Sequence, residues 1–123
     1  MSFARLETSF HSASNFGPLK AMATTLQGRV LIVDDVISAG TSVRESVEMI
    51  KAAGATPAGV AIAIDRQERG LGELSAVQEV EKNSGMPVIK IATLADLIAF
   101  LDGAADLAEF KPAVQAYRNQ YGV

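Results

Sequence analysis

The sequence contains no cysteine, no long apolar run and no cluster of basic residues. The lack of cysteine excludes disulfides and thiolate metal sites. The longest apolar stretches, such as Val30 to Val33 and Gly59 to Ile64, are far shorter than the ~20 residues that a membrane-spanning helix needs. With a net charge of -3 and no Lys/Arg patch to neutralise a phosphate polymer, we expect neither a membrane nor a nucleic-acid partner. The first residues lack the apolar core of a secretion signal, so the cytoplasm is the expected compartment.

The chain is large enough for one modest hydrophobic core. It has 123 residues, of which 49% are apolar, so we expect a single folded domain. Residues 1–29 are rich in Ser, Asn, Gly, Pro and Thr and have weak periodicity, whereas strand and helix patterns alternate from Val30 onward. The predicted organisation is therefore a mobile loop or arm over 1–29 and a core over 30–123.

The core pattern is typical of an α/β fold with a parallel sheet. A β-branched run at Val30–Val33, a helical pattern at Ser42–Ala53 and a second apolar run at Val60–Ile64 predict a strand, helix, strand crossover. Gly54 is a plausible C-cap of the helix. The continuous apolarity of the second run suits a strand buried on both sides, so we expect helices on both faces of the sheet.

The remainder of the chain continues the same alternation. A helical pattern at Leu74–Lys82 precedes a strand candidate at Val88–Ile91. Thr93 is placed to cap the next helix, with Asp96 in its first turn. A final amphipathic helix is predicted from about Leu107 to Tyr121.

The most informative segment joins the first predicted strand to the first helix. The strand ends in Asp34 and Asp35, and ligands of open α/β sheets bind at the carboxyl ends of strands. The small residues that follow let backbone N–H groups approach a phosphate, and the helix directs its positive end there. The carboxylates would repel that phosphate, so they must face hydroxyl donors or a cation. A sugar phosphate satisfies both halves of the segment.

This segment resembles the phosphoribosyl pyrophosphate (PRPP) signature of type I phosphoribosyltransferases, which have a Rossmann-like core. The resemblance rests on the contiguous run from Val30 to Ser42. It implies that the ribose phosphate is bound by Asp34, Asp35, Val36, Ile37, Ser38, Ala39, Gly40, Thr41 and Ser42. Bacterial receiver domains, which also contain a strand ending in Val-Asp-Asp, are the competing interpretation. Asp65 comes too early and Lys90 falls inside a strand for that family.

A second charged segment narrows the resemblance. The turn at 65–70, the segment 91–98 and the final residues 116–123 are similar to orotate phosphoribosyltransferases. By that resemblance, Arg66 holds the orotate carboxylate and Ser38 hydrogen-bonds the orotate ring, while Glu68 and Arg69 are expected on the surface. The implied reaction transfers the phosphoribosyl group from PRPP to orotate, yielding orotidine 5-phosphate and pyrophosphate.

The family reaction also needs cations at the departing diphosphate. The resemblance implies Mg²⁺ carried by the diphosphate rather than bound directly by the protein, together with a flexible loop donated across a homodimer. Arg5 and His11 match that loop in place and are, with Asp34 and Asp35, the predicted catalytic residues. Leu6 and Ser9 stand where the family has lysines.

The family's N-terminal half, which supplies a hood over orotate and a diphosphate-binding turn, has no counterpart in this sequence, so the core is expected to be truncated. Three interpretations stay open. The chain is an orotate phosphoribosyltransferase, a non-catalytic module that binds PRPP or a nucleotide, or a remnant whose shortened sheet exposes an apolar edge.

Overall fold

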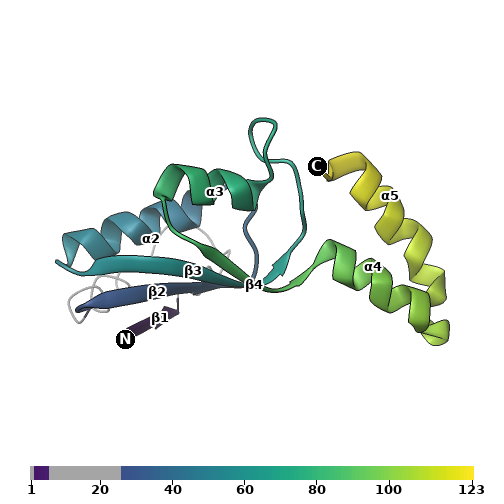
Figure 1. The fold of residues 1–123 in the computed structure, drawn as a ribbon, viewed down its shortest axis with the longest axis horizontal. Coiled ribbons are helices and arrows are strands. Elements are labelled where there is room, and N and C mark those ends of the chain that lie inside the picture. Colours follow the sequence, from purple (N-terminus) through teal and green to yellow (C-terminus); the bar gives the residue numbers. More distant parts are fainter. Residues whose placement is uncertain (1, 6–25) are drawn as a thin grey trace, which may run out of the picture.

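The computed structural model describes residues 2–5 and 26–123, which form a four-stranded parallel sheet and its helices. The strands lie in the order β1-β2-β3-β4 (Figure 1). Their bounds are Ser2–Arg5 for β1, Arg29–Asp34 for β2, Thr56–Asp65 for β3 and Val88–Thr93 for β4. The predicted α/β class and parallel sheet are confirmed.

The core lies between one face of this sheet and two helices. Helix α2 (Thr41–Ala52) and helix α3 (Ala76–Ser84) cover that face in Figure 1. Alternate residues of the two central strands point into the core and are almost fully buried: Val30, Ile32, Val60 and Ile62. Each buried side chain of this size contributes about 1.5–3 kcal/mol to folding relative to an exposed one. This packing holds the carboxyl ends of β2 and β3 in register beneath the site.

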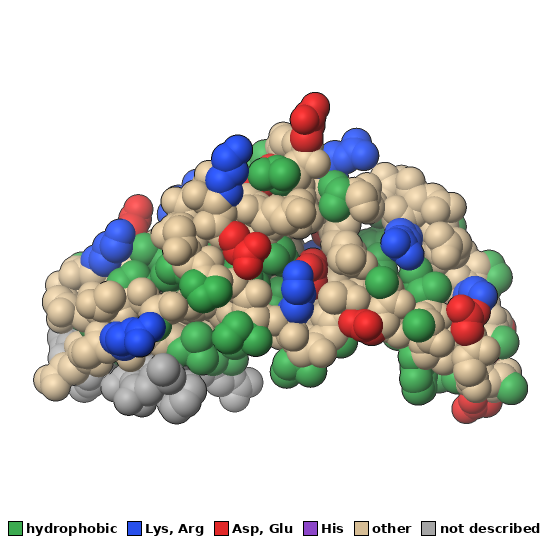
Figure 2. Space-filling view, in the orientation of Figure 1, with side chains coloured by type: hydrophobic (Ala, Val, Ile, Leu, Met, Phe, Trp, Pro, Cys, Tyr) green, Lys and Arg blue, Asp and Glu red, His purple; other side chains and the backbone are tan. Residues whose placement is uncertain are grey.

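Helices were expected on both faces of the sheet, but the described residues place helices on one face only. The sheet order runs in a single direction, and crossovers between parallel strands are right-handed. Two successive right-handed crossovers that advance in the same direction must place α2 and α3 on the same face. The opposite face carries exposed apolar side chains, with Ile89 60% and Ile91 87% accessible. Figure 2 shows apolar side chains along the lower side of the molecule, beneath the strands and beneath the helix at 94–103.

Helix ends follow the capping signals in the sequence. The predicted cap Thr93 begins helix α4 (Leu94–Gly103), and the side chains of Thr93 and Asp96 form a capping box. These bonds lower the pKa of the Asp96 carboxyl. Ser75 and Gln78 form a second capping box at α3. Gly54 lies just after α2 with a φ of +77°, as predicted for a residue that terminates a helix.

The last part of the chain folds back toward the sheet. The single helix expected from Leu107 is divided into a 3-10 helix, η1 (Ala105–Phe110), and helix α5 (Lys111–Tyr121), with Pro112 in the first turn of α5. Helices α4, η1 and α5 pack on one another, and the end of α5 returns to the loop that joins β3 to α3 (Figure 1). This return brings residues 121–123 beside residues 67–69.

Strand β1 adds an element that the sequence pattern did not predict. Its four residues pair in parallel with 30–33 of β2. Most of the arm expected over 1–29, including His11, lies in residues 6–25, outside the described residues, so its mobility stays a prediction. Of the described part, Leu26 packs against the core and Arg29 begins β2. Among the described residues, no helix is long and apolar enough to cross a membrane.

Candidate active site

Asp34 and Asp35 lie where β2 leaves the sheet, as the sequence predicted. The Asp34 carboxylate accepts a hydrogen bond from the backbone amide of Asp35 at 2.9 Å, and the Asp35 carboxylate accepts one from the amide of Val36 at 2.8 Å. The Ser42 hydroxyl donates to the second oxygen of Asp34 at 3.4 Å. These bonds close the segment into a loop that connects the strand end with the first turn of α2. Asp35 is exposed and Asp34 half-buried, so both carboxylates are open to a ligand.

The environment of Asp34 disfavours its negative charge. Partial burial raises the pKa of the Asp34 carboxyl above its ordinary value, and the neighbouring Asp35 carboxylate adds to this increase. Hydrogen bonds from the Asp35 amide and Ser42 act in the opposite direction. A carboxylate that is poorly compensated in the free protein gains from donors that a ligand brings, such as ribose hydroxyls.

The backbone between the two carboxylates and α2 is tied to the sheet. The carbonyl oxygen of Asp35 accepts hydrogen bonds from the amides of Ala63 and Ile64, at 3.0 and 3.1 Å. The Ile37 side chain is buried in the core. Together these contacts fix the path of the loop, while Ser38 and Ala39 remain exposed at its tip.

Gly40 has two reasons to lack a side chain. Its φ of +67° lies in the left-handed region, which costs other residues roughly 1–2 kcal/mol. A Cβ at this position would also lie 2.8 Å from Cγ2 of Val80 on α3. The close approach of α3 therefore requires glycine at the point where α2 begins.

The N-terminus of α2 differs from those of α3 and α4. No side chain of the described residues caps α2, and its first turn contains no acidic residue. The first N–H groups of a helix have no partner within the helix, and the helix dipole favours an anion beside them. The Thr41 and Ser42 hydroxyls lie in the same turn. The predicted phosphate loop thus has the electrostatics of an anion site.

The two residues predicted to bind orotate lie together. The guanidinium of Arg66, just after β3, donates from Nη2 to the Ser38 hydroxyl at 3.1 Å. The same nitrogen forms an ion pair with Glu68 at 3.1 Å. Glu68 was expected to be a surface residue, and this pairing corrects that expectation because its side chain is only 18% exposed. Arg66 is thereby aimed across the sheet edge at the loop that holds Asp34.

Arg66 is also incompletely satisfied. Among the described residues, its Nε atom is buried and finds no acceptor. A buried donor without an acceptor costs about 1–3 kcal/mol. The Arg66 side chain as a whole is 33% exposed, so its guanidinium can still meet a carboxylate ligand from the solvent side.

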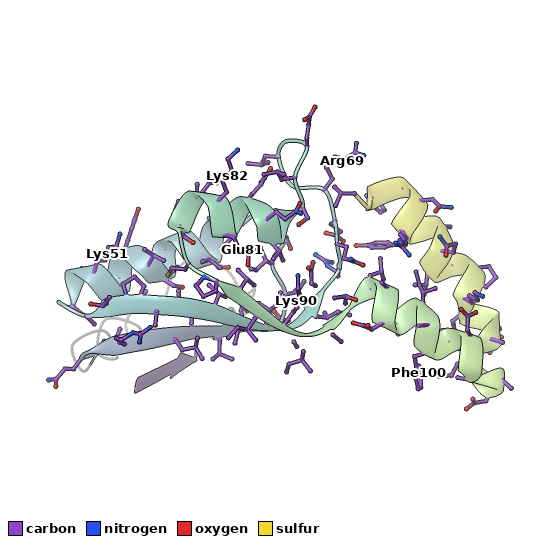
Figure 3. The ribbon with its side chains drawn as sticks, viewed as in Figure 1. Lys51, Arg69, Glu81, Lys82, Lys90 and Phe100 are labelled. Carbon is purple, nitrogen blue, oxygen red and sulfur yellow. The ribbon has the colours of Figure 1, made fainter. Side chains whose placement is uncertain are left out.

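A buried carboxylate stabilises the turn that carries Arg66. Asp65, at the end of β3, is 6% exposed. One of its oxygens accepts from the amide of Gln67 at 2.8 Å, and the other pairs with Lys90 of β4 at 3.2 Å. Figure 3 places Lys90 where the strands converge. Sequence reasoning missed the roles of Gln67 and Lys90. Lys90 contacts a residue of the neighbouring strand, and Gln67 contacts Ala95 of helix α4, so neither contact is visible in the local sequence.

Arg5 and His11, the other predicted catalytic residues, are not brought to this site by the described structure. Arg5 ends β1, and its side chain lies outside the described atoms. His11, Leu6 and Ser9 lie outside the described residues. Their roles stay predictions.

Comparison with known proteins identifies the family of the chain. A family profile described as the phosphoribosyl transferase domain matches residues 9–97, which is more than half of the chain and includes the whole of 30–42. The chain belongs to the phosphoribosyl transferase family. This membership excludes the receiver-domain interpretation of Asp34 and Asp35.

Relatives within the family are similar over most of this phosphoribosyl transferase chain. An orotate phosphoribosyltransferase of Chromobacterium violaceum is 69% identical over 98 residues, covering 80% of this chain and 46% of the relative. One of Salmonella newport is 60% identical over 102 residues, covering 83% and 48%. The chain thus spans about half the length of these relatives.

Solved structures agree with the fold. The orotate phosphoribosyltransferase of Francisella tularensis superposes with a TM-score of 0.63 at 30% identity, covering 77% of this chain and 47% of that one. That of Aeropyrum pernix has a TM-score of 0.50 at 32% identity, covering 62% and 42%. Within residues 2–5 and 26–123, no group of three or more His, Cys, Asp or Glu side chains gathers in a way that could hold a metal ion.

Proposed function

We propose that this chain carries the ribose-phosphate and orotate sites of an orotate phosphoribosyltransferase. The reaction transfers the 5-phosphoribosyl group from PRPP to orotate and yields orotidine 5-phosphate and pyrophosphate, a step of pyrimidine (UMP) biosynthesis. The observation that carries the proposal is the 3.1 Å hydrogen bond from Arg66 to Ser38. It joins the cation suited to an anionic base with the loop suited to a sugar phosphate.

The loop divides its work between two kinds of group. Backbone amides at Ala39 and Gly40, with the Thr41 and Ser42 hydroxyls, bind the 5-phosphate at the open end of α2. Asp34 and Asp35 accept hydrogen bonds from the ribose hydroxyls and so orient the sugar. A ribose held at both ends presents its anomeric carbon in one direction, which is the main benefit of a positioned substrate.

Arg66 and Ser38 select the base. The Arg66 guanidinium pairs with the orotate carboxylate, and Ser38, already bonded to Arg66, is placed to bond the ring. Bases that lack the carboxylate would leave Arg66 paired only with Glu68 and Ser38. Selection therefore depends on where the turn holds the guanidinium.

The departing diphosphate needs positive charge that the described residues provide only in part. Mg²⁺ prefers oxygen ligands in an octahedral arrangement. Asp34 and Asp35 are assigned to the ribose hydroxyls, so diphosphate oxygens and water would supply the ligands of Mg²⁺. When bound, Mg²⁺ would stabilise the charge that develops on the leaving group. Arg5 and His11 are proposed to assist from the N-terminal loop, where Leu6 and Ser9 offer no cation.

We further propose that the active form is a homodimer. Ile89 and Ile91 are exposed on the sheet face that carries no helix among residues 2–5 and 26–123, and Phe100 of α4 is also exposed. Apolar surface of this kind is stabilised by association. Size-exclusion chromatography with light scattering would measure the mass directly, and a monomer at assay concentration would contradict this part of the proposal.

A second function, a binding module without catalysis, is favoured by one specific observation. The chain spans only 46% of the Chromobacterium violaceum enzyme, yet the proposed ribose-phosphate loop at 34–42 is complete within it. The ribose-phosphate loop could then hold PRPP or a nucleotide without turnover.

One experiment separates the two functions. Orotate loss is followed by absorbance with PRPP and Mg²⁺, for the wild type, for Asp34→Asn/Asp35→Asn, and for the charge-matched control Glu45→Gln/Glu109→Gln at exposed sites. Turnover in the wild type and control, abolished in the Asp double variant, supports the enzyme. Calorimetric binding of ribose 5-phosphate that only the Asp double variant loses, without turnover, supports the module. Equal binding in all three proteins would refute the site.

A further inference from the structure

Gln67 and the returning segment 121–123 surround the turn that carries Arg66. We propose that these residues form a clamp, here called the base-site clamp, that positions Arg66 for the carboxylate of the base. Gln67 and Val123 are positioning residues in this proposal, because neither contacts the ligand. The proposal rests on the function proposed above and identifies what determines the base specificity of that site.

The backbone of Gln67 is held in a conformation that it would not choose alone. Its φ of +53° makes it the one non-glycine residue with positive φ in the described part of the chain. Such a residue is destabilised by about 1–3 kcal/mol and persists only where surrounding contacts impose the conformation. Because the residue is glutamine and not glycine, other contacts must stabilise this backbone conformation.

Three hydrogen bonds with three different parts of the chain impose it. The amide of Gln67 donates to Asp65 at 2.8 Å, and its carbonyl accepts from the amide of Val123 at 3.1 Å. Its side-chain oxygen accepts from the amide of Ala95, in the first turn of α4, at 3.0 Å. Every polar group of Gln67 except its side-chain NH₂ is thus hydrogen-bonded. Arg66 precedes Gln67 directly, so these bonds set the direction in which its side chain leaves the turn.

The same clamp continues along the next two residues. The amide of Arg69 donates to the carbonyl of Tyr121 at 2.8 Å, and Glu68 forms an antiparallel bridge with Gly122. Figure 3 shows Arg69 beside the end of α5. Glu68 is the ion-pair partner of Arg66, so the returning segment fixes both the backbone of Arg66 and the carboxylate that holds its guanidinium.

The backbone at Gly122, where α5 ends, decides which substitutions are tolerated at Val123. A Cβ at Gly122 would lie 2.5 Å from the carbonyl oxygen of Arg118. The φ of -74° and ψ of 164° at Gly122 are in the extended region, which is the conformation preferred before a proline. Val123→Pro therefore fits the backbone before it and removes the amide that bonds Gln67. Val123→Ala keeps that amide and is the matched control.

A second matched pair tests the side chain of Gln67. Gln67→Leu has nearly the same shape but no acceptor for the Ala95 amide, whereas Gln67→Glu keeps an acceptor at the helix N-terminus, where a negative charge is favoured. A merely structural role would weaken all ligands together. A positioning role would weaken only ligands that reach Arg66.

The experiment compares three ligands by calorimetry on the full chain: orotidine 5-phosphate, uridine 5-phosphate, which lacks the carboxylate, and ribose 5-phosphate, which lacks the base. We expect Gln67→Leu and Val123→Pro to weaken orotidine 5-phosphate about tenfold, as for one lost hydrogen bond to a charged group. Binding of the other two ligands should stay within about twofold. Gln67→Glu and Val123→Ala should keep wild-type affinity for all three ligands. Faster hydrogen exchange of residues 66–70 should accompany the loss in Gln67→Leu and Val123→Pro.

The outcomes separate the clamp from the proposed function. A wild type that binds orotidine and uridine 5-phosphates equally would refute orotate selection, and with it the purpose of the clamp. A wild type that prefers orotidine 5-phosphate, together with variants that keep that preference, would refute the clamp alone. An equal loss for all three ligands would also overturn it, since it would mean a general loss of folding.

Discussion

The proposed phosphate loop at 34–42 and the proposed base-site turn at 65–70 lie at the same sheet edge but are built differently. The loop is made of contiguous residues, and the groups proposed to bind ligand are open. No side chain of the described residues caps α2, and the carboxylates of Asp34 and Asp35 are accessible. The turn is fixed by β4, α4 and residues 121–123, and its polar backbone is nearly all engaged. An anion site can thus be encoded locally, whereas placing one guanidinium required contacts from much of the chain.

The difference has an energetic basis. Open N–H groups at a helix end lose little by remaining in water, because water satisfies them until a phosphate arrives. A turn with a positive φ at Gln67 and a buried carboxylate at Asp65 is unfavourable unless every partner is present. The open N–H groups of the loop should therefore depend less on distant hydrogen-bond partners than the turn does.

The largest effect should come from breaking the loop at its tightest point. Gly40→Ala combines the left-handed backbone with a Cβ only 2.8 Å from Val80. We expect a loss of about 2–4 kcal/mol in unfolding free energy and at least a tenfold loss of ribose 5-phosphate binding. Denaturant unfolding and calorimetry measure both.

The control for this change is Gly85→Ala, at the end of α3. Gly85 has nearly the same φ, +68°, but open space around its Cβ position. It should lose only about 1–2 kcal/mol and keep ligand binding. Equal losses at the two glycines would mean that the approach of Val80 does not matter.

Removing the cation of the turn should have the next largest effect. Arg66→Leu should weaken orotidine 5-phosphate by roughly 10- to 100-fold, since hydrogen bonds to charged groups contribute about 1.5–3 kcal/mol. Ribose 5-phosphate binding, which depends on the loop, should not change. Arg69→Leu removes the same charge from an exposed site nearby and should alter neither affinity by more than about twofold. If both variants behaved alike, net charge rather than position would explain the binding.

A third variant weakens the ion pair that stabilises the turn and leaves the residues of the loop unchanged. Lys90→Met leaves the buried Asp65 carboxylate without its cation. We expect a loss of about 1–2 kcal/mol in unfolding free energy, less than for a fully buried pair because Lys90 is 43% exposed. Orotidine 5-phosphate binding should weaken while ribose 5-phosphate binding persists. Lys82→Met, on the exposed part of α3, should cost about 0.5 kcal/mol or less.

The smallest expected effect concerns the charge of Asp34. Because its pKa is raised in the folded protein, the ionised carboxylate destabilises the fold at neutral pH, and this penalty disappears as the pH falls through the folded pKa. Asp34→Asn should therefore raise the unfolding free energy of the free protein at pH 7 by less than about 1 kcal/mol, because solvent screens the half-exposed group. The gain should vanish below the ordinary pKa of 3.8. Lower stability of the variant at pH 7 would contradict this account.

Much of the fold could be predicted from local patterns. Apolar runs predicted β2, β3 and β4, and Thr93 with Asp96 predicted the start of α4. Strand β1 could not be predicted, because four residues with weak periodicity become a strand only by pairing with β2. The placement of α2 and α3 on one face follows from the order of the strands, which no local pattern contains.

The sequence alone indicated the proposed phosphate loop, since its carboxylates, small residues and helix start are contiguous from Asp34 to Ser42. It also indicated Arg66 and Ser38 by resemblance. Only the tertiary structure brought those two side chains to 3.1 Å and bound Gln67 to Val123 and Ala95. The physical reason is that a turn with an unfavourable backbone is stable only when distant elements supply its hydrogen bonds, and those elements meet only in the folded chain.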